Sequence, residues 1–229
     1  PTYNERENIA DLLREILSLR LEADLSVLVV DDNSPDGTGD LIQDLGEKDP
    51  RIRLISRKEA KGRGTAAIKG LEAALSLAPD YVIEMDADGS HQPRYIPSLL
   101  LAAEEGDLVL GSRFTPGGRD TDRGFVRRII TFLVRRFIRR LYGLAVEDVS
   151  SGFRCFRKHV LEKIGLDSLI STGPSEVLEI LYKAHLEGFS IREVPIIFLD
   201  RKRGKTKLTL FTLLETLFMA IKFKMLYRR

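Results

Sequence analysis

Two carboxylates separated by one residue are the strongest chemical signal in the sequence. Asp86 and Asp88 flank Ala87 directly after the apolar run 81–85, which is typical of a buried strand. Two carboxylates at a strand end can both reach one divalent cation, and their hard oxygen atoms favour Mg²⁺ or Mn²⁺. Such an ion would stabilise the charge that grows on a departing diphosphate. An isolated motif of this kind also fits a surface turn, here closed by Gly89, so the other motifs must decide.

A second acidic turn, residues 30–38, also follows an apolar run. Asp32 could accept hydrogen bonds from a nucleotide base or ribose there, but turn formation and helix capping explain the segment equally well. The segment Lys61–Thr65 opens a helical pattern with two glycines, which would let backbone amides approach an anion. It lacks the Gly-Lys-Ser/Thr ending of an ATP-binding loop, which disfavours an ATP-hydrolysing enzyme, and an ordinary turn fits it slightly better.

The elements that must position these residues alternate along the chain. Three runs of branched apolar residues each end in a polar turn: residues 27–30, 81–85 and 108–110. Helical apolar patterns lie between them, over residues 9–17 and 65–77. This alternation predicts an α/β fold with a mostly parallel sheet flanked by helices. Ligands bind beyond the carboxyl ends of the strands in such sheets, so three polar turns should meet at one rim: residues 31–32, 86–88 and 111–113.

Composition limits the remaining classes of protein and site. The chain has 229 residues, 43% of them hydrophobic and 31% charged, which suits one globular domain. The single cysteine, Cys155, excludes an internal disulfide and is expected in the core. His91, His159 and His185 share no metal-ligand spacing and are expected at the surface or in turns. No apolar run is long enough to span a membrane, and we expect residues upstream of Pro1, because the first motif lacks a preceding strand.

Positive charge is concentrated although the formal net charge is only +2. Residues 113–140 contain nine arginines and two acidic residues. A helix expected over about 125–142 has one apolar side, formed by Val126, Ile129, Ile130, Leu133, Phe137 and Leu141, and arginines opposite it. A second amphipathic helix is expected over 208–227, with Phe211, Leu214, Leu217, Phe218, Ile221 and Met225 in its stripe. Both fit elements that lie at a membrane surface, while packing in the protein core is the alternative.

Together the motifs resemble the polyprenyl-phosphate hexosyltransferases of glycosyltransferase family 2, which include the dolichol-phosphate mannose synthases. The resemblance covers nearly the whole chain and depends on the order and spacing of seven segments. These are PTYNEREN (1–8), VVDDNSPDGT (29–38), MDAD (85–88), GSRF (111–114), SGFR (151–154), EVPI (193–196) and DRKRGKTK (200–207). The resemblance implies a GT-A fold, a Rossmann-like mixed and mostly parallel sheet flanked by helices, in one domain over residues 1–229.

The resemblance also implies roles for individual residues. The nucleotide base and ribose would be held by Pro1, Tyr3, Glu5, Val30 and Asp32. The metal and diphosphate would be held by Asp86, Ala87 and Asp88, with Ser90 at the position of a third metal ligand that is glutamine in some relatives. The donor or the acceptor phosphate would be engaged by Arg113, Arg201 and Lys207, and the acceptor by Arg127 and Thr131. The candidate catalytic residues among these are Asp88, Arg113 and Arg127.

The implied reaction transfers mannose from GDP-mannose to dolichyl or polyprenyl phosphate with inversion, at the cytoplasmic face of a membrane and with Mg²⁺ or Mn²⁺ as cofactor. Nucleic acid is not an expected partner. A phosphate monoester is largely ionised at neutral pH, so no catalytic base is expected.

Three alternatives remain at this level. A UDP-glucose donor fits the same frame, and residues 173–178 depart from the family pattern before Glu179 returns to it, which leaves the choice of sugar open. A sugar-phosphate nucleotidyltransferase would need a stronger glycine-rich loop near the N-terminus. A basic module that binds a membrane or nucleic acid would explain the arginine-rich helix, but its regular apolar stripe disfavours nucleic acid.

Overall fold

The computed structural model describes residues 1–58, 62–121, 124–199 and 210–227, and for residues 125–127, 210 and 211 it describes the backbone alone. The helices are α1 (Arg6–Leu17), α2 (Thr38–Lys48), α3 (Arg63–Leu75), α4 (Ile96–Ala103), α5 (Phe125–Tyr142), α6 (Lys158–Ile164), α7 (Glu176–Leu186) and α8 (Leu210–Leu226). The strands are β1 (Val27–Asp31), β2 (Ile52–Ser56), β3 (Tyr81–Glu84), β4 (Leu108–Ser112), β5 (Arg119–Asp120), β6 (Arg154–Arg157), β7 (Ile191–Pro195) and β8 (Ile197–Phe198). Two 3₁₀ turns, η1 (Pro93–Tyr95) and η2 (Leu166–Ser168), complete the described elements.

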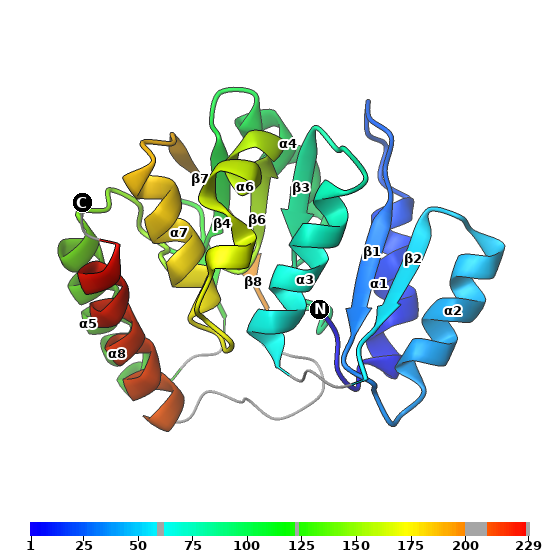
Figure 1. Cartoon of the computed structure of the whole chain (residues 1–229), viewed down its shortest axis with the longest axis horizontal. Coiled ribbons are helices and arrows are strands. Elements are labelled where there is room, and N and C mark those ends of the chain that lie inside the picture. The colour runs from blue at the N-terminus through cyan, green and yellow to red at the C-terminus, as the bar shows by residue number, and fades with distance from the viewer. Residues whose placement is uncertain (59–61, 122–123, 200–209, 228–229) are drawn as a thin grey trace.

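The expected α/β architecture with parallel strands and flanking helices is confirmed (Figure 1). Strands β1 and β2 pair in parallel, and a four-stranded sheet has the order β3-β6-β4-β7. Strand β6 is antiparallel to β3 and β4, whereas β4 and β7 are parallel, so the sheet is mixed. Helix α3 packs against both β1 and β3 and thereby joins the two sheets. Short strands β5 and β8 form a third, two-stranded sheet.

The four-stranded sheet is covered on both faces, as the side chains of β4 demonstrate. All five residues of β4 are buried, which explains its uninterrupted apolar sequence. Successive side chains point to opposite faces of a strand. Leu108 and Leu110 accordingly belong to a core cluster with residues of α5, α6, α7 and α8, whereas Val109 belongs to a second cluster with residues of α1 and α4. The sheet therefore supplies a rigid base from which loops can position polar groups.

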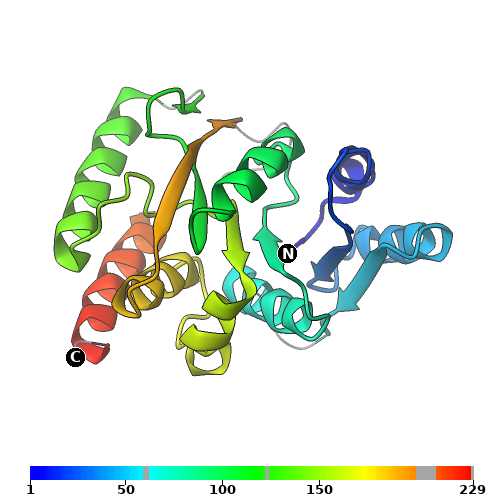
Figure 2. The same cartoon turned by 90° about the horizontal axis from the view of Figure 1, so that it is seen from above.

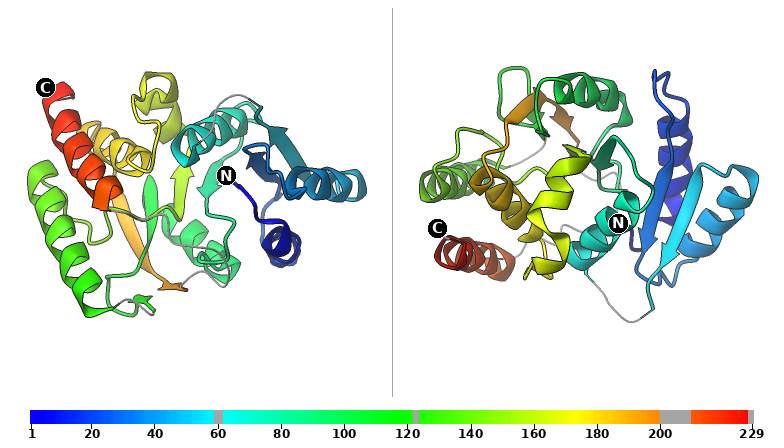
Figure 3. Two further views of the ribbon diagram at one scale, coloured as in Figure 1. Left: turned by 90° about the horizontal axis from the view of Figure 1, so that it is seen from below. Right: turned by 45° about the horizontal axis from the view of Figure 1, so that its top comes forward.

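The two ends of the molecule differ in character. Strands β1 and β2, with α1 and α2, form one end, and α5 and α8 lie side by side at the other (Figures 2 and 3). Helix α5 ends at Gly143, whose φ of 73° gives the left-handed conformation that commonly terminates a helix. Within the described residues, no helix is both long and apolar enough to cross a membrane.

The structure corrects several sequence-based boundaries. Strand β4 continues to Ser112, so Gly111 and Ser112 lie inside the strand and only Arg113 enters the following turn. Helix α3 begins at Arg63 rather than at Thr65, because Gly62 adopts a φ of 132° and turns the chain into the helix earlier. The helix expected over 125–142 is α5, and the one expected over 208–227 is observed as α8 from Leu210 onward.

Candidate functional site

The acidic turn after β3 is held by its own hydrogen bonds. The backbone N–H and the hydroxyl of Ser90 both donate to Oδ1 of Asp88, at 3.1 and 2.5 Å. Ser90, expected as a metal ligand, is therefore a partner of Asp88 in this structure. Asp88 is 5% exposed, whereas the side chain of Asp86 remains 24% exposed. The turn thus presents one anchored carboxylate and one more accessible carboxylate at the strand end.

His91 lies in this turn, one of its two expected places, but it is buried rather than at the surface. Its side chain is 3% exposed, and its Nδ1 atom accepts a hydrogen bond from the backbone N–H of Asp86 at 2.9 Å. Burial lowers the pKa of His91 although the carboxylates of Asp86 and Asp88 oppose this effect. The ring also stacks on Phe153, with 5.1 Å between ring centroids. A neutral imidazole therefore holds the backbone of the acidic turn through its hydrogen bond with Asp86.

The chemistry of the donor set fits a divalent cation. Asp86 and Asp88 supply hard carboxylate oxygens from a single turn, and Mg²⁺ typically takes one or two protein carboxylates together with water and substrate phosphates. Among the described residues, no group of three or more His, Cys, Asp or Glu side chains forms a dense metal cage. Two carboxylates from one turn therefore fit a cation that would complete its coordination with water or a substrate phosphate.

A buried network of charges surrounds the acidic turn. Arg154, fully buried, pairs with Glu84 of β3 at 2.6 Å, and the two residues are cross-strand neighbours in the β3–β6 pairing. Arg63, from the first turn of α3, contacts Asp86 at 2.9 Å and Glu84 at 3.7 Å. It also pairs with the fully buried Glu176 of α7. The acidic turn is therefore tied to three elements of the fold.

A second polar cluster occupies the carboxyl end of β1. Asp32 is 5% exposed, pairs with Arg57 at 3.0 Å and accepts a hydrogen bond from the backbone N–H of Gly62 at 2.8 Å. Thr2 pairs alongside β1 in an isolated parallel bridge to Asp31, and its N–H donates to the carbonyl of Val30 at 2.8 Å. Val30 is buried, and its carbonyl is the acceptor for Thr2.

Other residues expected to hold a nucleotide lie around this cluster. Tyr3 is 40% exposed, as a side chain that stacks on a base would have to be before binding. The carboxylate of Glu5 accepts a hydrogen bond from Nδ2 of Asn8 at 2.7 Å, at the start of α1. Pro1 is half-buried and precedes the Thr2 pairing. The structure therefore brings Pro1, Tyr3, Glu5, Val30 and Asp32 to one end of β1.

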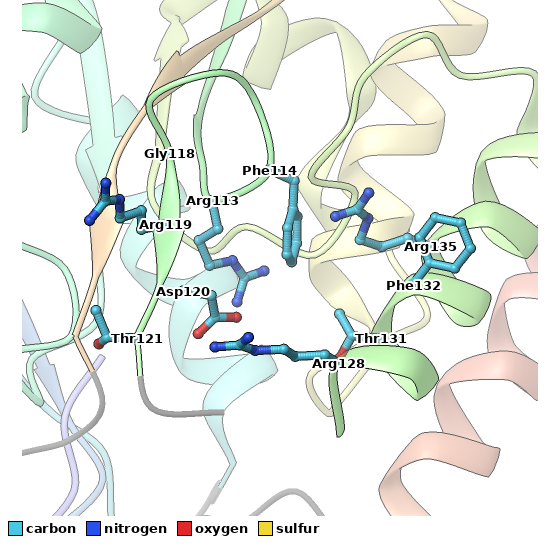
Figure 4. Close-up of a pocket in the computed structure, with 10 residues that line it drawn as sticks. All are labelled: Arg113, Phe114, Gly118, Arg119, Asp120, Thr121, Arg128, Thr131, Phe132 and Arg135. Carbon is cyan, nitrogen blue, oxygen red and sulfur yellow. The ribbon is translucent and has the colours of Figure 1, made fainter. Parts of the chain in front are cut away.

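An arginine-lined pocket of about 560 Å³ lies between α5 and the segment 113–121 (Figure 4). Its lining comprises Arg113, Phe114, Gly118, Arg119, Asp120, Thr121, Arg128, Thr131, Phe132 and Arg135. Two expected site residues, Arg113 and Thr131, are thus brought together although they come from different elements. With four arginines and one aspartate in its wall, the pocket suits an anionic ligand.

Arg113 is fixed within this pocket by a bidentate ion pair. Its Nε and Nη2 atoms each donate to the carboxylate of Asp148 at 2.7 Å, and Nη2 also donates to Ser150 at 2.8 Å. Asp148 is in turn held through its backbone N–H, which donates to Glu193 of β7 at 2.8 Å. The sequence predicted an arginine that engages phosphate, and the structure adds the buried carboxylate that sets its orientation.

Aromatic rings connect the pocket to the acidic turn. The ring of Phe198 lies 5.2 Å from the Arg113 guanidinium and 5.5 Å from the His91 ring. Phe114 lies between Arg113 and Arg135 in Figure 4, with the Arg135 guanidinium 3.7 Å from its ring centroid. The N–H of Leu199 donates to the carbonyl of Ser90 at 3.3 Å, so the chain leaves β8 at the acidic turn.

Some expected site residues lie outside the described residues. These are Lys61, Arg201 and Lys207, together with the side chain of Arg127, whose backbone belongs to α5. Their roles stay predictions.

Much of the predicted apolar stripes of α5 and α8 is exposed, although Leu141 of the α5 stripe packs against the core and Leu217 of the α8 stripe is half-buried. Exposed apolar residues on α5 are Ile129, Ile130, Phe132, Leu133 and Phe137, and those on α8 are Leu214, Phe218, Ile221, Met225 and Leu226. The inward faces instead use Ile138 and Tyr142 on α5 and Ala220 and Phe223 on α8. Arg135 and Arg139, expected opposite the stripe, turn toward Glu147 and pair with it at 3.1 and 2.7 Å.

Sequence reasoning missed Arg57, Arg63, Glu84, Asp148 and Glu176. Each is a buried or half-buried charge whose partner is distant in the sequence, so no local pattern marks it. The sequence carries a weak signal for two of them. Glu84 is a charged residue within an otherwise apolar strand, and Glu176 is a charged residue at the start of an apolar helix.

Comparisons with known proteins show which sequences this chain resembles. The model of glycosyl transferase family 2 matches residues 1–165. Polyprenol monophosphomannose synthase of Mycolicibacterium smegmatis is 37% identical over 95% of this chain and 82% of that protein. Undecaprenyl-phosphate mannosyltransferase of Micrococcus luteus is 38% identical over 91% of this chain and 85% of that protein.

A solved structure shares the fold. Glucosyl-3-phosphoglycerate synthase from Mycobacterium tuberculosis, crystallised with Mn²⁺, UDP-glucose and phosphoglyceric acid, superimposes with a TM-score of 0.67. The match covers 98% of this chain and 76% of that one at 21% identity, and it supports the GT-A architecture alone.

Proposed function

Because the chain belongs to glycosyltransferase family 2, we propose that it transfers mannose from GDP-mannose to a polyprenyl phosphate. The two bacterial relatives named above are polyprenyl-phosphate mannosyltransferases by name and align over more than nine tenths of this chain. Their likeness supports mannose and a prenyl-linked phosphate as the substrates. The proposed products are polyprenyl-phosphate-mannose and GDP.

One observation carries the proposal: an acidic turn and an arginine pocket are joined through Phe198 and His91. A glycosyl transfer to a phosphate needs both parts, because the donor diphosphate needs a cation and the acceptor phosphate needs positively charged donors. Asp86 and Asp88 would serve the first need and Arg113 the second.

Asp86 and Asp88 would hold a divalent cation, Mg²⁺ or Mn²⁺, and Ser90 supports Asp88 from within the turn. When bound, this ion supplies the positive charge that stabilises the diphosphate as it leaves. The Mn²⁺ in the structurally similar synthase supports a divalent cation for this fold.

The acceptor needs orientation more than it needs a base. An oxygen of the acceptor phosphate would attack the anomeric carbon as the bond from that carbon to the diphosphate oxygen breaks, with inversion. A phosphate monoester is largely ionised at neutral pH, so no protein group has to remove a proton. Arg113, held by Asp148, and Thr131 would place the phosphate, with Arg127 as a further predicted contact. Arg201 and Lys207 stay predicted contacts of the donor or acceptor.

A membrane surface is the proposed location of the reaction, because the acceptor is a lipid. Exposed apolar side chains on α5 and α8 adjoin Arg136, Arg140 and Lys222, which are also exposed. Such a face can enter the headgroup region while its cations meet anionic lipid. The same helix α5 lines the arginine pocket, so a phosphate at the membrane surface could reach it. We propose the cytoplasmic face of the membrane.

The proposal is tested with purified protein, GDP-mannose and a short-chain polyprenyl phosphate in detergent. We expect mannosyl transfer by the wild type and none by Asp88→Asn, with an unchanged thermal midpoint for unfolding. Full transfer by Asp88→Asn would refute the assigned role of the acidic turn. Transfer from UDP-glucose in place of GDP-mannose would support the alternative donor.

A further inference from the structure

Arg63 contacts three carboxylates at once, although nothing in the proposed reaction assigns it a role. Its Nε atom donates to Oδ1 of Asp86 at 3.0 Å, and its Nη2 atom lies 2.9 Å from the same oxygen in an ion pair. Nη2 lies 3.7 Å from Glu84, and Nη1 donates to Glu176. One guanidinium therefore lies directly against a proposed metal ligand.

The position of this guanidinium is fixed by the surrounding structure. Glu176 is fully buried, and Glu84 is itself held by Arg154. Gly152 lies against the other side, where an added Cβ would come within 2.5 Å of Nη2 of Arg63. Burial opposes the charge of Arg63, but Asp86, Glu176 and Glu84 outweigh it and raise the pKa of the guanidinium. Arg63 is therefore a cation whose position is set by contacts with three carboxylates.

Arg63 occupies only one of the two oxygens of Asp86. The hydrogen bond from Nε and the ion-pair contact of Nη2 both involve Oδ1, and no hydrogen bond to Oδ2 is found within the described part of the chain. The Asp86 side chain as a whole is 24% exposed, so it is not sealed off from a ligand. Arg63 therefore binds one oxygen of the Asp86 carboxylate, Oδ1, and leaves Oδ2 as the oxygen that a ligand could use.

We propose that Arg63 is a positioning residue that makes binding of the divalent cation depend on the donor diphosphate. It orients Asp86 through Oδ1, and its positive charge repels a cation that approaches Oδ2. A diphosphate that arrives with the cation offsets this repulsion, since it brings negative charge to the same place. This inference rests on the proposed metal-dependent function and adds to it an order of binding: the cation alone binds weakly, and the cation with nucleotide binds tightly.

The test measures cation binding directly rather than turnover. Free Mn²⁺ is followed by electron paramagnetic resonance during titration with MnCl₂, with and without saturating GDP, and again with UDP. For Arg63→Met we expect Mn²⁺ alone to bind about tenfold tighter or more, because the repelling charge is gone. We also expect the gain in affinity on adding GDP to shrink by a similar factor. Lys69→Met removes one positive charge from the exposed face of the same helix α3 and should match the wild type.

A double variant separates this role from a structural one. Removing Arg63 alone leaves Glu176 buried without its partner, which can prevent folding. Arg63→Met combined with Glu176→Gln removes both charges and keeps the formal charge of the chain. We expect the double variant also to bind Mn²⁺ alone more tightly than the wild type, since Arg63 and not Glu176 lies against Asp86.

The outcomes are distinguishable. Wild-type affinity and wild-type nucleotide dependence in the folded double variant would overturn the inference and leave the proposed function intact. Weaker Mn²⁺ binding in both Arg63 variants would also overturn it, because orientation of Asp86 would then outweigh repulsion. Absence of Mn²⁺ binding to the wild type, even with GDP or UDP, would remove the metal from the proposed function and the inference with it.

Discussion

The guanidinium of Arg113 and the carboxylate of Asp148 form a bidentate ion pair, with both N···O distances at 2.7 Å and Asp148 fully buried. Asp148 orients the arginine without reaching the pocket lining itself. The pair therefore connects β7, through Glu193 and Asp148, to the pocket in which the acceptor phosphate is proposed to bind.

Asp148→Asn is expected to reduce transfer through Arg113. The side chain of asparagine is neutral and has only one oxygen atom, so it cannot accept both hydrogen bonds from Arg113. The guanidinium therefore loses its fixed orientation. We expect kcat/KM for the polyprenyl phosphate to fall by about 10- to 100-fold, the scale typical of a displaced positioning group. The KM for GDP-mannose should change little. Steady-state kinetics with each substrate varied in turn checks this, and an equal loss for donor and acceptor would contradict it.

The same pair predicts a loss of stability in acid. Burial opposes ionisation of Asp148, but pairing with Arg113 outweighs it and lowers the pKa below the ordinary value of 3.8. A carboxyl with a lowered pKa stabilises the folded state above its unfolded pKa, and this stability is lost as pH falls toward the folded pKa. The thermal midpoint of the wild type should therefore drop below about pH 4. In Asp148→Asn the drop should be shallower, whereas the exposed Asp11→Asn should follow the wild type; identical slopes in all three proteins would refute this account.

Arg154→Met tests the buried network under the acidic turn. The variant leaves Glu84 without its 2.6 Å partner in a site where Arg154 itself is fully buried. Breaking a buried pair on one side costs about 3–5 kcal/mol, and this loss should appear in urea unfolding. The exposed Arg14→Met, in a surface pair with Asp11, should leave the free energy of unfolding nearly unchanged. Equal stabilities of the two variants would show that Glu84 finds another partner.

Phe218→Ser tests the membrane surface. Phe218 of α8 is 66% exposed, and Leu101 of α4 is 67% exposed, so the two side chains form a matched pair. If α8 enters the headgroup region, Phe218→Ser should weaken binding to phosphatidylcholine–phosphatidylglycerol vesicles roughly tenfold, while Leu101→Ser should not. Co-sedimentation with vesicles measures both. Similar losses in the two variants would mean that exposed apolar area in general, not α8, governs binding.

The sequence predicted the elements better than the contacts between them. The apolar runs and helical periodicity located β1, β3, β4, α5 and α8 to within a few residues, because burial imposes these patterns locally. Arg63–Glu176 and Arg113–Asp148 escaped prediction because their members are far apart in the sequence. The partner of a buried charge is determined by how the elements pack, and a single sequence does not show which elements pack together.

His91 illustrates the same limit within the site. A lone histidine after a turn fits a solvated position, yet here Phe153 and the Asp86 backbone enclose it. By contrast, the spacing of Asp86 and Asp88 at a strand end was readable, since both residues belong to one local turn. The roles of Asp86, Asp88, Ser90, Arg127 and Thr131 in binding stay predictions.

The most direct test of the central claim is transfer of radiolabelled hexose to a short polyprenyl phosphate with Mg²⁺ or Mn²⁺. GDP-mannose and UDP-glucose are compared side by side, each with and without EDTA. We predict a labelled lipid from GDP-mannose that disappears in EDTA and returns when the cation is restored. Labelled lipid from UDP-glucose alone, or from GDP-mannose at full rate in EDTA, would contradict the proposed donor or the proposed cation respectively, and no labelled lipid under any condition would contradict the proposed function.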